Sequence, residues 1–157
     1  MDFNLTEERA MLRYMLQRFL GERYDHEARR KLIASGAPYD AGILTALAKL
    51  GILGAMFSED DGGFGGTGCD LLVVFEELGR AGTIEPVVGS SVLAGGLLAE
   101  LGNASQKALI GQVIGGVTVL ALAHGEPQSR YDLSHVHTTA QADGGQIVLN
   151  GTKTHVV

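Results

Sequence analysis

The segment Val117–Tyr131, VTVLALAHGEPQSRY, separates two kinds of sequence pattern in this chain. It opens with an apolar run that ends at Ala123 and has glycines at both borders, and its length and β-branched content predict a buried strand. The run stops at HGEP, where Pro127 restricts its own backbone and that of the residue before it, so a polar turn follows. Because binding residues often lie on loops that leave a rigid element, we expect a ligand site at residues 124 to 131.

The part of the chain before this segment is predicted to be helical. Apolar residues from Leu12 to Leu20 recur at helical spacing, with Asn4 or Thr6 as the N-cap and Gly21 as the end of the helix. The same criteria predict five further helices, at residues 26–35 after Asp25, 41–50 after Asp40, 67–80, 87–97 after Pro86, and 104–114 after Asn103.

The fifth predicted helix is rich in small residues. We expect its larger apolar side chains to be buried, namely Val88, Val92, Leu93 and Leu97. Glycines and serines at 89–91 and 95–96 occupy the other faces. Their number indicates either that another backbone or a ligand approaches closely, or that the helix is simply weak, and the sequence leaves both interpretations open.

A glycine-rich loop joins the third and fourth predicted helices. Residues 51–68, GILGAMFSEDDGGFGGTG, include a GxGxxG spacing that starts at Gly63 and nominally matches a dinucleotide-binding turn. Three acidic residues at 59–61 would repel a pyrophosphate there, and no second strand follows the next helix. We therefore interpret this segment as a turn between helices.

After the opening segment the pattern changes to short strands. Alternation predicts a strand from His135 to Ala142, and a turn at residues 143–145 leads to a second strand at Gln146–Leu149. Asn150-Gly151 is a strong hairpin signal, so Thr152–Val157 is predicted to return as a third strand.

The predicted fold class is mainly α. Residues 1–115 are expected to form an N-terminal all-α domain of about six helices, and residues 116–157 the first strands of an incomplete β-domain. A sheet of three or four strands exposes an edge and a face unless something covers them. We therefore expect this chain to be the front part of a longer protein.

Composition excludes some classes of function. The net charge of −6 and the absence of a basic stripe argue against binding to nucleic acid. No apolar run approaches the length of a membrane span, and no secretory signal is visible. A single cysteine, Cys69, allows no internal disulfide and fits a reducing, cytoplasmic location.

The residues alone suggest few candidates for chemistry. His135 and His137 would share one face of a strand and could form half of a metal site, but a solvent-facing pair is the preferred interpretation. His124 could line a site or be a hydrogen-bonded structural histidine. No base and nucleophile occur together, so no catalytic residue and no metal site are assigned.

Several motifs together resemble the acyl-CoA dehydrogenase family. These are LTEER with LRYMLQRFL, the loop SEDDGGFGG, the helix end FEELGR, and ALAHGEPQSR followed by LNGTKTHVV. The resemblance is closest to the small-subunit type of pimeloyl-CoA dehydrogenase and spans the whole chain. It implies a family fold of an all-α domain, a middle β-domain and a C-terminal four-helix domain, of which this chain holds the first and the start of the second.

The resemblance also implies FAD as the cofactor. The family turn V-T-E-P is matched by His124, Gly125, Glu126 and Pro127, so a glycine stands where the family has a flavin-contacting threonine. Arg130 and Tyr131 stand in place of a glycine and a serine. His155 and Val157 stand in place of a tryptophan and a threonine that contact the flavin.

The implied activity is α,β-desaturation of an acyl-CoA thioester, with electrons passed to electron-transfer flavoprotein. The family's catalytic glutamate lies in the C-terminal domain and has no counterpart here, so the isolated chain is expected to be inactive. Implied partners are the acyl-CoA substrate and a large dehydrogenase subunit or a second copy. The alternative is a non-catalytic α-domain module that assembles with a dehydrogenase partner.

Overall fold

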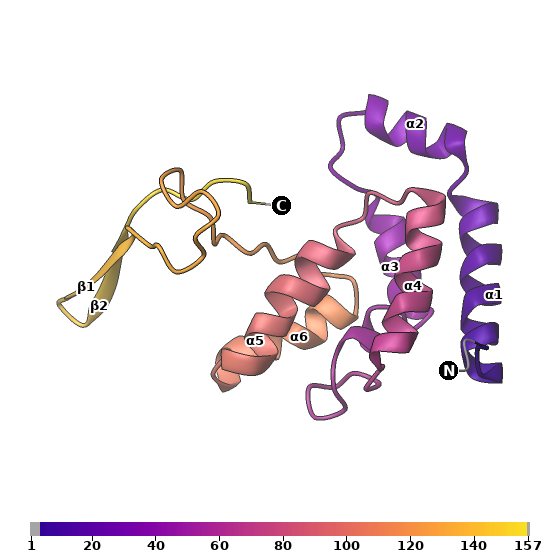
Figure 1. Ribbon diagram of the computed structural model, residues 1–157, viewed down its shortest axis with the longest axis horizontal. Coiled ribbons are helices and arrows are strands. Elements are labelled where there is room, and N and C mark those ends of the chain that lie inside the picture. The colour runs from indigo at the N-terminus through magenta and orange to yellow at the C-terminus, as the bar shows by residue number, and fades with distance from the viewer. Residues whose placement is uncertain (1–3, 157) are drawn as a thin grey trace. The chain divides into compact units, whose positions relative to one another are not determined.

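The computed structural model describes residues 4–156 and divides the chain into two compact units. The first unit ends at Leu120 and is helical, and the second begins at Ala121 and contains one β-hairpin (Figure 1). The mainly α fold class predicted from the sequence is confirmed.

The helices begin close to the predicted N-caps. Their bounds are α1 (Glu7–Arg23), α2 (His26–Ala34), α3 (Ala41–Lys49), α4 (Gly68–Ala81), α5 (Gly96–Leu101) and α6 (Ala104–Ile114), with a 3₁₀ turn η1 (Gly54–Met56) and a π-helix η2 (Val87–Gly95). Thr6, Asp25 and Asp40 each accept a backbone N–H of the first helical turn that follows. The prediction that Gly21 ends α1 is wrong. The helix continues through Arg23, and Tyr24 is its C-cap.

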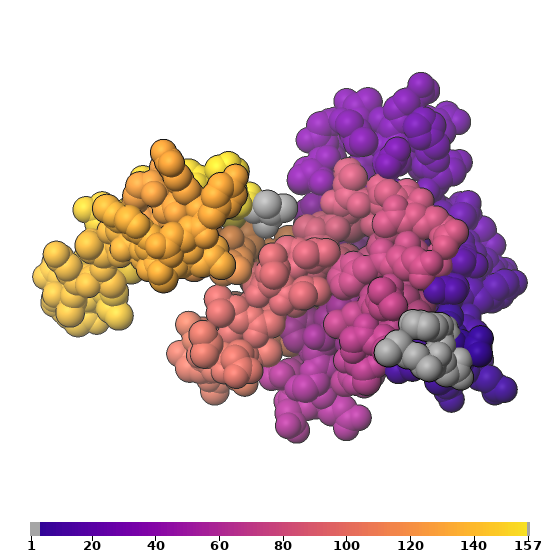
Figure 2. Space-filling model, in the orientation of Figure 1, coloured from indigo at the N-terminus to yellow at the C-terminus, as the bar shows by residue number. Residues whose placement is uncertain are grey.

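The core of the helical unit lies between α1, α3 and α4. Leu16, Leu47 and Val74, one from each of these helices, have no exposed surface. α1 and α4 lie side by side, whereas α2 buries no residue fully and projects from the unit (Figures 1 and 2). A smaller apolar cluster joins Phe57 to Ile110 of α6. Burial of these side chains supplies the main driving force for this unit.

The glycine-rich loop packs tightly against η1. A side chain at Gly63 would bring its Cβ within 2.3 Å of the Phe57 carbonyl oxygen, and one at Gly66 within 2.4 Å of the Ala55 oxygen. These close backbone contacts require glycine at both positions. They support the interpretation of the segment as a turn.

The fifth helix buries the opposite set of residues from the one predicted. Ser90 and Ser91 are buried, whereas Val88 and Leu93 are about half exposed. The buried positions Val87, Ser90, Ser91, Ala94 and Gly95 still recur at intervals of three and four residues, so the wrong face follows from assigning the larger apolar side chains to the core. Small residues face inward because other backbone and side chains approach them: Ser90 Oγ accepts the Leu120 N–H at 2.9 Å, and a Cβ on Gly95 would touch the Phe57 ring.

The buried strand predicted at Val117–Ala123 is not formed. Val117 is 80% exposed, while Val119 and Leu120 pack against the two apolar clusters of the helical unit. A strand needs a hydrogen-bonded neighbour. Within residues 4–156 the only paired strands are β1 (Thr139–Asp143) and β2 (Gln146–Asn150).

The hairpin is antiparallel, with Ala140 opposite Leu149 and the predicted turn at residues 143–145. The first strand begins at Thr139 and not at His135. The predicted third strand is absent over residues 152–156, and Val157 lies outside the described residues. The returning chain instead binds the turn that precedes the hairpin, since Thr154 N–H donates to the Gly125 carbonyl at 2.8 Å.

Among the described residues, no helix combines the length and the apolar character that crossing a membrane requires.

A polar clamp joins α1 to the beginning of α4. Asp70 accepts Arg9 Nε at 2.8 Å, Thr67 N–H at 2.8 Å and the Thr67 hydroxyl at 2.5 Å. The Arg9 guanidinium and the two Thr67 donors hold the pKa of the Asp70 carboxyl well below its usual range. The ionised form is therefore the one that the folded state favours.

Replacing Asp70 by Asn should destabilise the helical unit at pH 7 by about 1–2 kcal/mol, because the ion pair with Arg9 is lost and one of the two acceptor oxygens becomes an NH2 group that can only donate. Since the folded-state pKa is lowered, the contribution of Asp70 is full above the pKa of an unfolded aspartate, about 3.9, and declines as the pH falls below it. Urea unfolding at pH 7 and pH 3 measures both effects. Asp60→Asn, on the exposed loop, is the control, and an undiminished difference at pH 3 would contradict the clamp.

Candidate functional site

The turn after Ala123 borders a hollow of about 620 Å³ in the second unit. Its lining consists of Gly125, Pro127, Arg130, Tyr131 and His155. The structure thus brings together four residues that the sequence predicted as cofactor-binding, although His155 is 24 or more residues away from the others along the chain. The size is that of a pocket for a small organic ligand.

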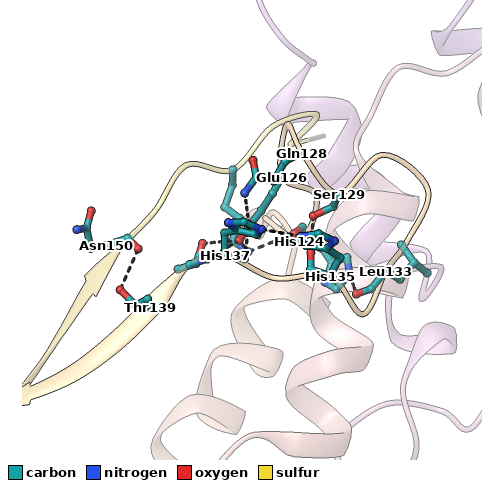
Figure 3. A network of polar contacts seen from close by, with 11 residues as sticks. His124, Glu126, Gln128, Ser129, Leu133, His135, His137, Thr139 and Asn150 are labelled. Atoms are coloured by element: carbon teal, nitrogen blue, oxygen red, sulfur yellow. Dashed lines mark hydrogen bonds and ion pairs between the residues drawn. The ribbon is translucent and has the colours of Figure 1, made fainter.

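The Glu126 carboxylate anchors the turn from its inner side. Only 4% of Glu126 is exposed, and its oxygens accept five hydrogen bonds. Figure 3 shows Glu126 near Gln128 and His137 within this polar network. The donors are Lys153 Nζ (2.8 Å), Thr138 Oγ1 (2.5 Å), Thr138 N (3.0 Å), His137 N (2.7 Å) and Gln128 Nε2 (2.8 Å). These donors come from three separate parts of the second unit, so one side chain fixes their relative positions.

This environment favours the ionised carboxylate. The Lys153 ammonium, followed by the Thr138 hydroxyl and the His137 amide, holds the pKa of Glu126 well below its usual range. A buried charge is tolerated only when it is paired and hydrogen-bonded, and here both conditions are met. The side chain of Glu126 is therefore part of the scaffold, and Glu126 is not among the residues that line the hollow.

Two residues of the hollow have a backbone conformation that is unusual for their type. Arg130 has φ of 50° and His155 has φ of 53°, and no other non-glycine residue in the described range has a positive φ. Left-handed conformations in such residues persist only where the surroundings impose them, and they concentrate at ligand sites. Both residues line the same hollow.

Gly125 has a steric role at the edge of the hollow. A Cβ added there would lie 3.2 Å from the Thr154 carbonyl oxygen, closer than an ordinary contact. The returning segment therefore lies nearer to the turn than a threonine at this position would easily allow.

Of the predicted residues that the structure describes, His124 and Glu126 do not line the hollow. His124 Nε2 forms a hydrogen bond with the Leu133 carbonyl at 3.0 Å, and its own carbonyl accepts Lys153 Nζ at 3.2 Å. Its contacts are those of a structural histidine, one of the two alternatives that the sequence left open. Val157 lies outside the described residues.

The histidine pair lies in the segment before β1 and not on a strand. The rings of His135 and His137 stack with centroids 4.7 Å apart, and both residues are exposed (Figure 3). Within residues 4–156 no group of three or more potential ligands could hold a metal ion. The pair is solvent-facing, as preferred from the sequence.

Sequence reasoning missed the residues that assemble the site. Lys153 and Thr138 were assigned no role, although together they supply three of the five hydrogen bonds to Glu126. The chain held one signal. Glu126 stands directly before Pro127 in a turn that follows an apolar run, and a glutamate that is buried there needs a partner. The sequence does not say which of the later residues provides that partner.

Comparisons with known proteins agree on one family. The model of the acyl-CoA dehydrogenase N-terminal domain matches residues 6–114. The chain is 31% identical to (2S)-methylsuccinyl-CoA dehydrogenase of Cereibacter sphaeroides, over 97% of this chain and 28% of that protein. It is 30% identical to the caffeyl-CoA reductase–Etf complex subunit CarC of Acetobacterium woodii, over 96% of this chain and 40% of that protein.

A solved structure shows the same arrangement of elements. The Tcur3481–Tcur3483 steroid ACAD G363A variant superposes with a TM-score of 0.82 at 31% identity, over 96% of this chain and 41% of that one. The chain thus spans between about a quarter and two fifths of the length of these relatives. With its helical unit matched over residues 6–114, the chain belongs to the acyl-CoA dehydrogenase family.

Proposed function

We propose that this chain is the N-terminal part of an FAD-dependent acyl-CoA dehydrogenase subunit, which contributes to the α,β-desaturation of an acyl-CoA thioester. The observation that supports this most strongly is the hollow beside the turn at residues 124–131, in a chain whose helical unit belongs to this family. A resemblance to the pimeloyl-CoA type and a cytoplasmic location remain predictions from the sequence.

The residues of the hollow fit part of a flavin nucleotide. Tyr131 is 99% exposed and offers an aromatic face, and Arg130 offers a guanidinium suited to a phosphate. No carboxylate lines the hollow, because the Glu126 side chain is turned inward and paired with Lys153. An anionic ligand in the hollow would therefore meet the Arg130 guanidinium and no carboxylate among the lining residues.

When bound, FAD would supply the hydride acceptor for the reaction. The residues of this chain would hold and orient it: Gly125 through its backbone, Tyr131 by stacking, and Arg130 by charge-assisted hydrogen bonds. By the family resemblance, the catalytic glutamate belongs to the C-terminal domain of these enzymes and matches none of the residues described here. We accordingly assign no proton transfer to any side chain described here.

Partner subunits are part of the proposal. One relative is named as a subunit of a complex with Etf, and the name of the solved steroid ACAD pairs two chains. We propose that this chain assembles with a large dehydrogenase subunit or with a second copy, and that electron-transfer flavoprotein accepts the electrons. The half-exposed Val88 and Leu93 on η2 provide apolar surface that such an assembly could cover.

A specific observation favours the alternative of a non-catalytic module. Gly125 and His155 stand where the family has flavin-contacting side chains, and the close contact between Gly125 and Thr154 leaves little room to restore a threonine. A chain that had lost its flavin contacts could still use its helical unit to bind a dehydrogenase partner. Flavin binding separates the two functions.

The purified chain should bind added FAD, detected as a change in flavin fluorescence on titration. Arg130→Gln should weaken this binding at least tenfold, because a charge-assisted contact to phosphate is lost. Arg18→Gln, which alters an exposed ion pair with Glu22 on α1, should leave it unchanged. A chain that does not bind FAD at any concentration tested would favour the non-catalytic module.

The chain by itself should not oxidise acyl-CoA. With acyl-CoA and an artificial electron acceptor, we expect the rate to equal that of the buffer, because no catalytic base is assigned within these residues. Adding the dehydrogenase partner should restore turnover. Acceptor reduction by the chain alone would contradict the assignment of the base to another part of the enzyme.

A further inference from the structure

Lys153 connects the returning segment to the turn at two points. Its ammonium donates to Glu126 Oε1 at 2.8 Å and to the His124 carbonyl at 3.2 Å. The Glu126 side chain is 1% exposed and the Lys153 side chain 26% exposed, so this ion pair is largely shielded from solvent. Pairs of this kind are screened far less than surface pairs, and removal of Lys153 would leave the buried Glu126 charge with hydrogen-bond donors but no counter-ion.

The residue after Lys153 continues the same contact. Thr154 N–H donates to the Gly125 carbonyl at 2.8 Å, directly beside the ion pair. Lys153 and Thr154 are thus bound in succession to the turn at residues 124–126. The next residue, His155, then enters the hollow in a left-handed conformation.

The backbone of His155 requires such support. A φ of 53° is uncommon for a residue with a side chain, so contacts that fix the neighbouring backbone help to hold His155 in this conformation. The contacts that precede it are those of Lys153 and Thr154. Arg130, the other left-handed residue of the hollow, belongs to the turn that the Glu126 carboxylate anchors from within.

We propose that Lys153 is a positioning residue for the hollow. Through its ion pair with Glu126 it holds residues 153–155 against the turn and thereby places His155 at the wall opposite the turn residues. It does not contact the ligand. The nature of that ligand, a flavin nucleotide, rests on the proposed function, but the positioning role rests only on contacts within the second unit.

Three variants of the complete chain test this role. Lys153→Met removes the charge, Lys153→Arg keeps it, and Lys31→Met is the matched control because it removes an exposed ion pair with Glu27 on α2. The first readout is amide hydrogen exchange at Thr154, which reports closure of the segment without any ligand. The second is the dissociation constant for FAD.

We expect Lys153→Met to speed exchange at Thr154 at least tenfold and to weaken FAD binding at least tenfold, while the amides that pair β1 with β2 keep their protection. Lys153→Arg should restore both values to within about threefold of the original, and Lys31→Met should change neither. This pattern separates a positioning role from a general loss of stability, which would affect the hairpin equally.

Unchanged exchange at Thr154 in Lys153→Met, or an arginine variant as impaired as the methionine variant, would overturn the proposal. If Lys153→Met also unfolds the hairpin, Thr138→Val replaces it: this variant removes one donor to Glu126 and should speed exchange at Thr154 by a smaller factor. No increase there would again overturn it. If the original chain binds no FAD, the proposed cofactor role fails, whereas exchange at Thr154 still decides the role of Lys153.

Discussion

The second unit depends on one buried charge. It has little apolar core of its own, since every residue of both strands is exposed and Ile147 and Leu149 point into solvent. Two-stranded hairpins are marginal without further packing. The Glu126 carboxylate compensates by binding three segments through five donors, so the order of this unit rests on polar contacts more than on burial of apolar area.

The helical unit follows a different principle. Leu16, Leu47 and Val74 fill its centre, and the clamp between Arg9 and Asp70 joins two helices at their ends. Such a unit keeps its shape mainly through packing, and its buried Glu77 is paired with Arg13 of α1 and Arg80 of α4. The chain therefore combines a helical unit that is held together mainly by packing with a smaller unit in which polar contacts position the residues that line the hollow.

Local signals explain which features the sequence could predict. Caps such as Thr6, Asp25 and Asp40 act on the backbone within four residues, so helix starts were predicted correctly. The strand at Val117–Ala123 and the buried face of η2 were not, because strand pairing and the packing of Leu120 and Phe57 against small residues of η2 are set by contacts distant in sequence. The turn was predicted as a site from its local sequence. Lys153, which we propose holds His155 in that site, was missed because its partner Glu126 is distant in sequence.

The Glu126 carboxylate stays ionised because Lys153 and the Thr138 and His137 donors stabilise its charge. Its folded-state pKa is lowered, so its contribution to stability is full above the pKa of an ordinary glutamate, about 4.3, and is lost as the pH falls below that value. Carboxyl carbon NMR from pH 7 to pH 2 measures this titration directly. We expect the Glu126 signal to titrate well below the pKa of an ordinary glutamate, together with loss of the hairpin resonances. A Glu126 signal that titrates near 4.3 while the hairpin stays intact would contradict it.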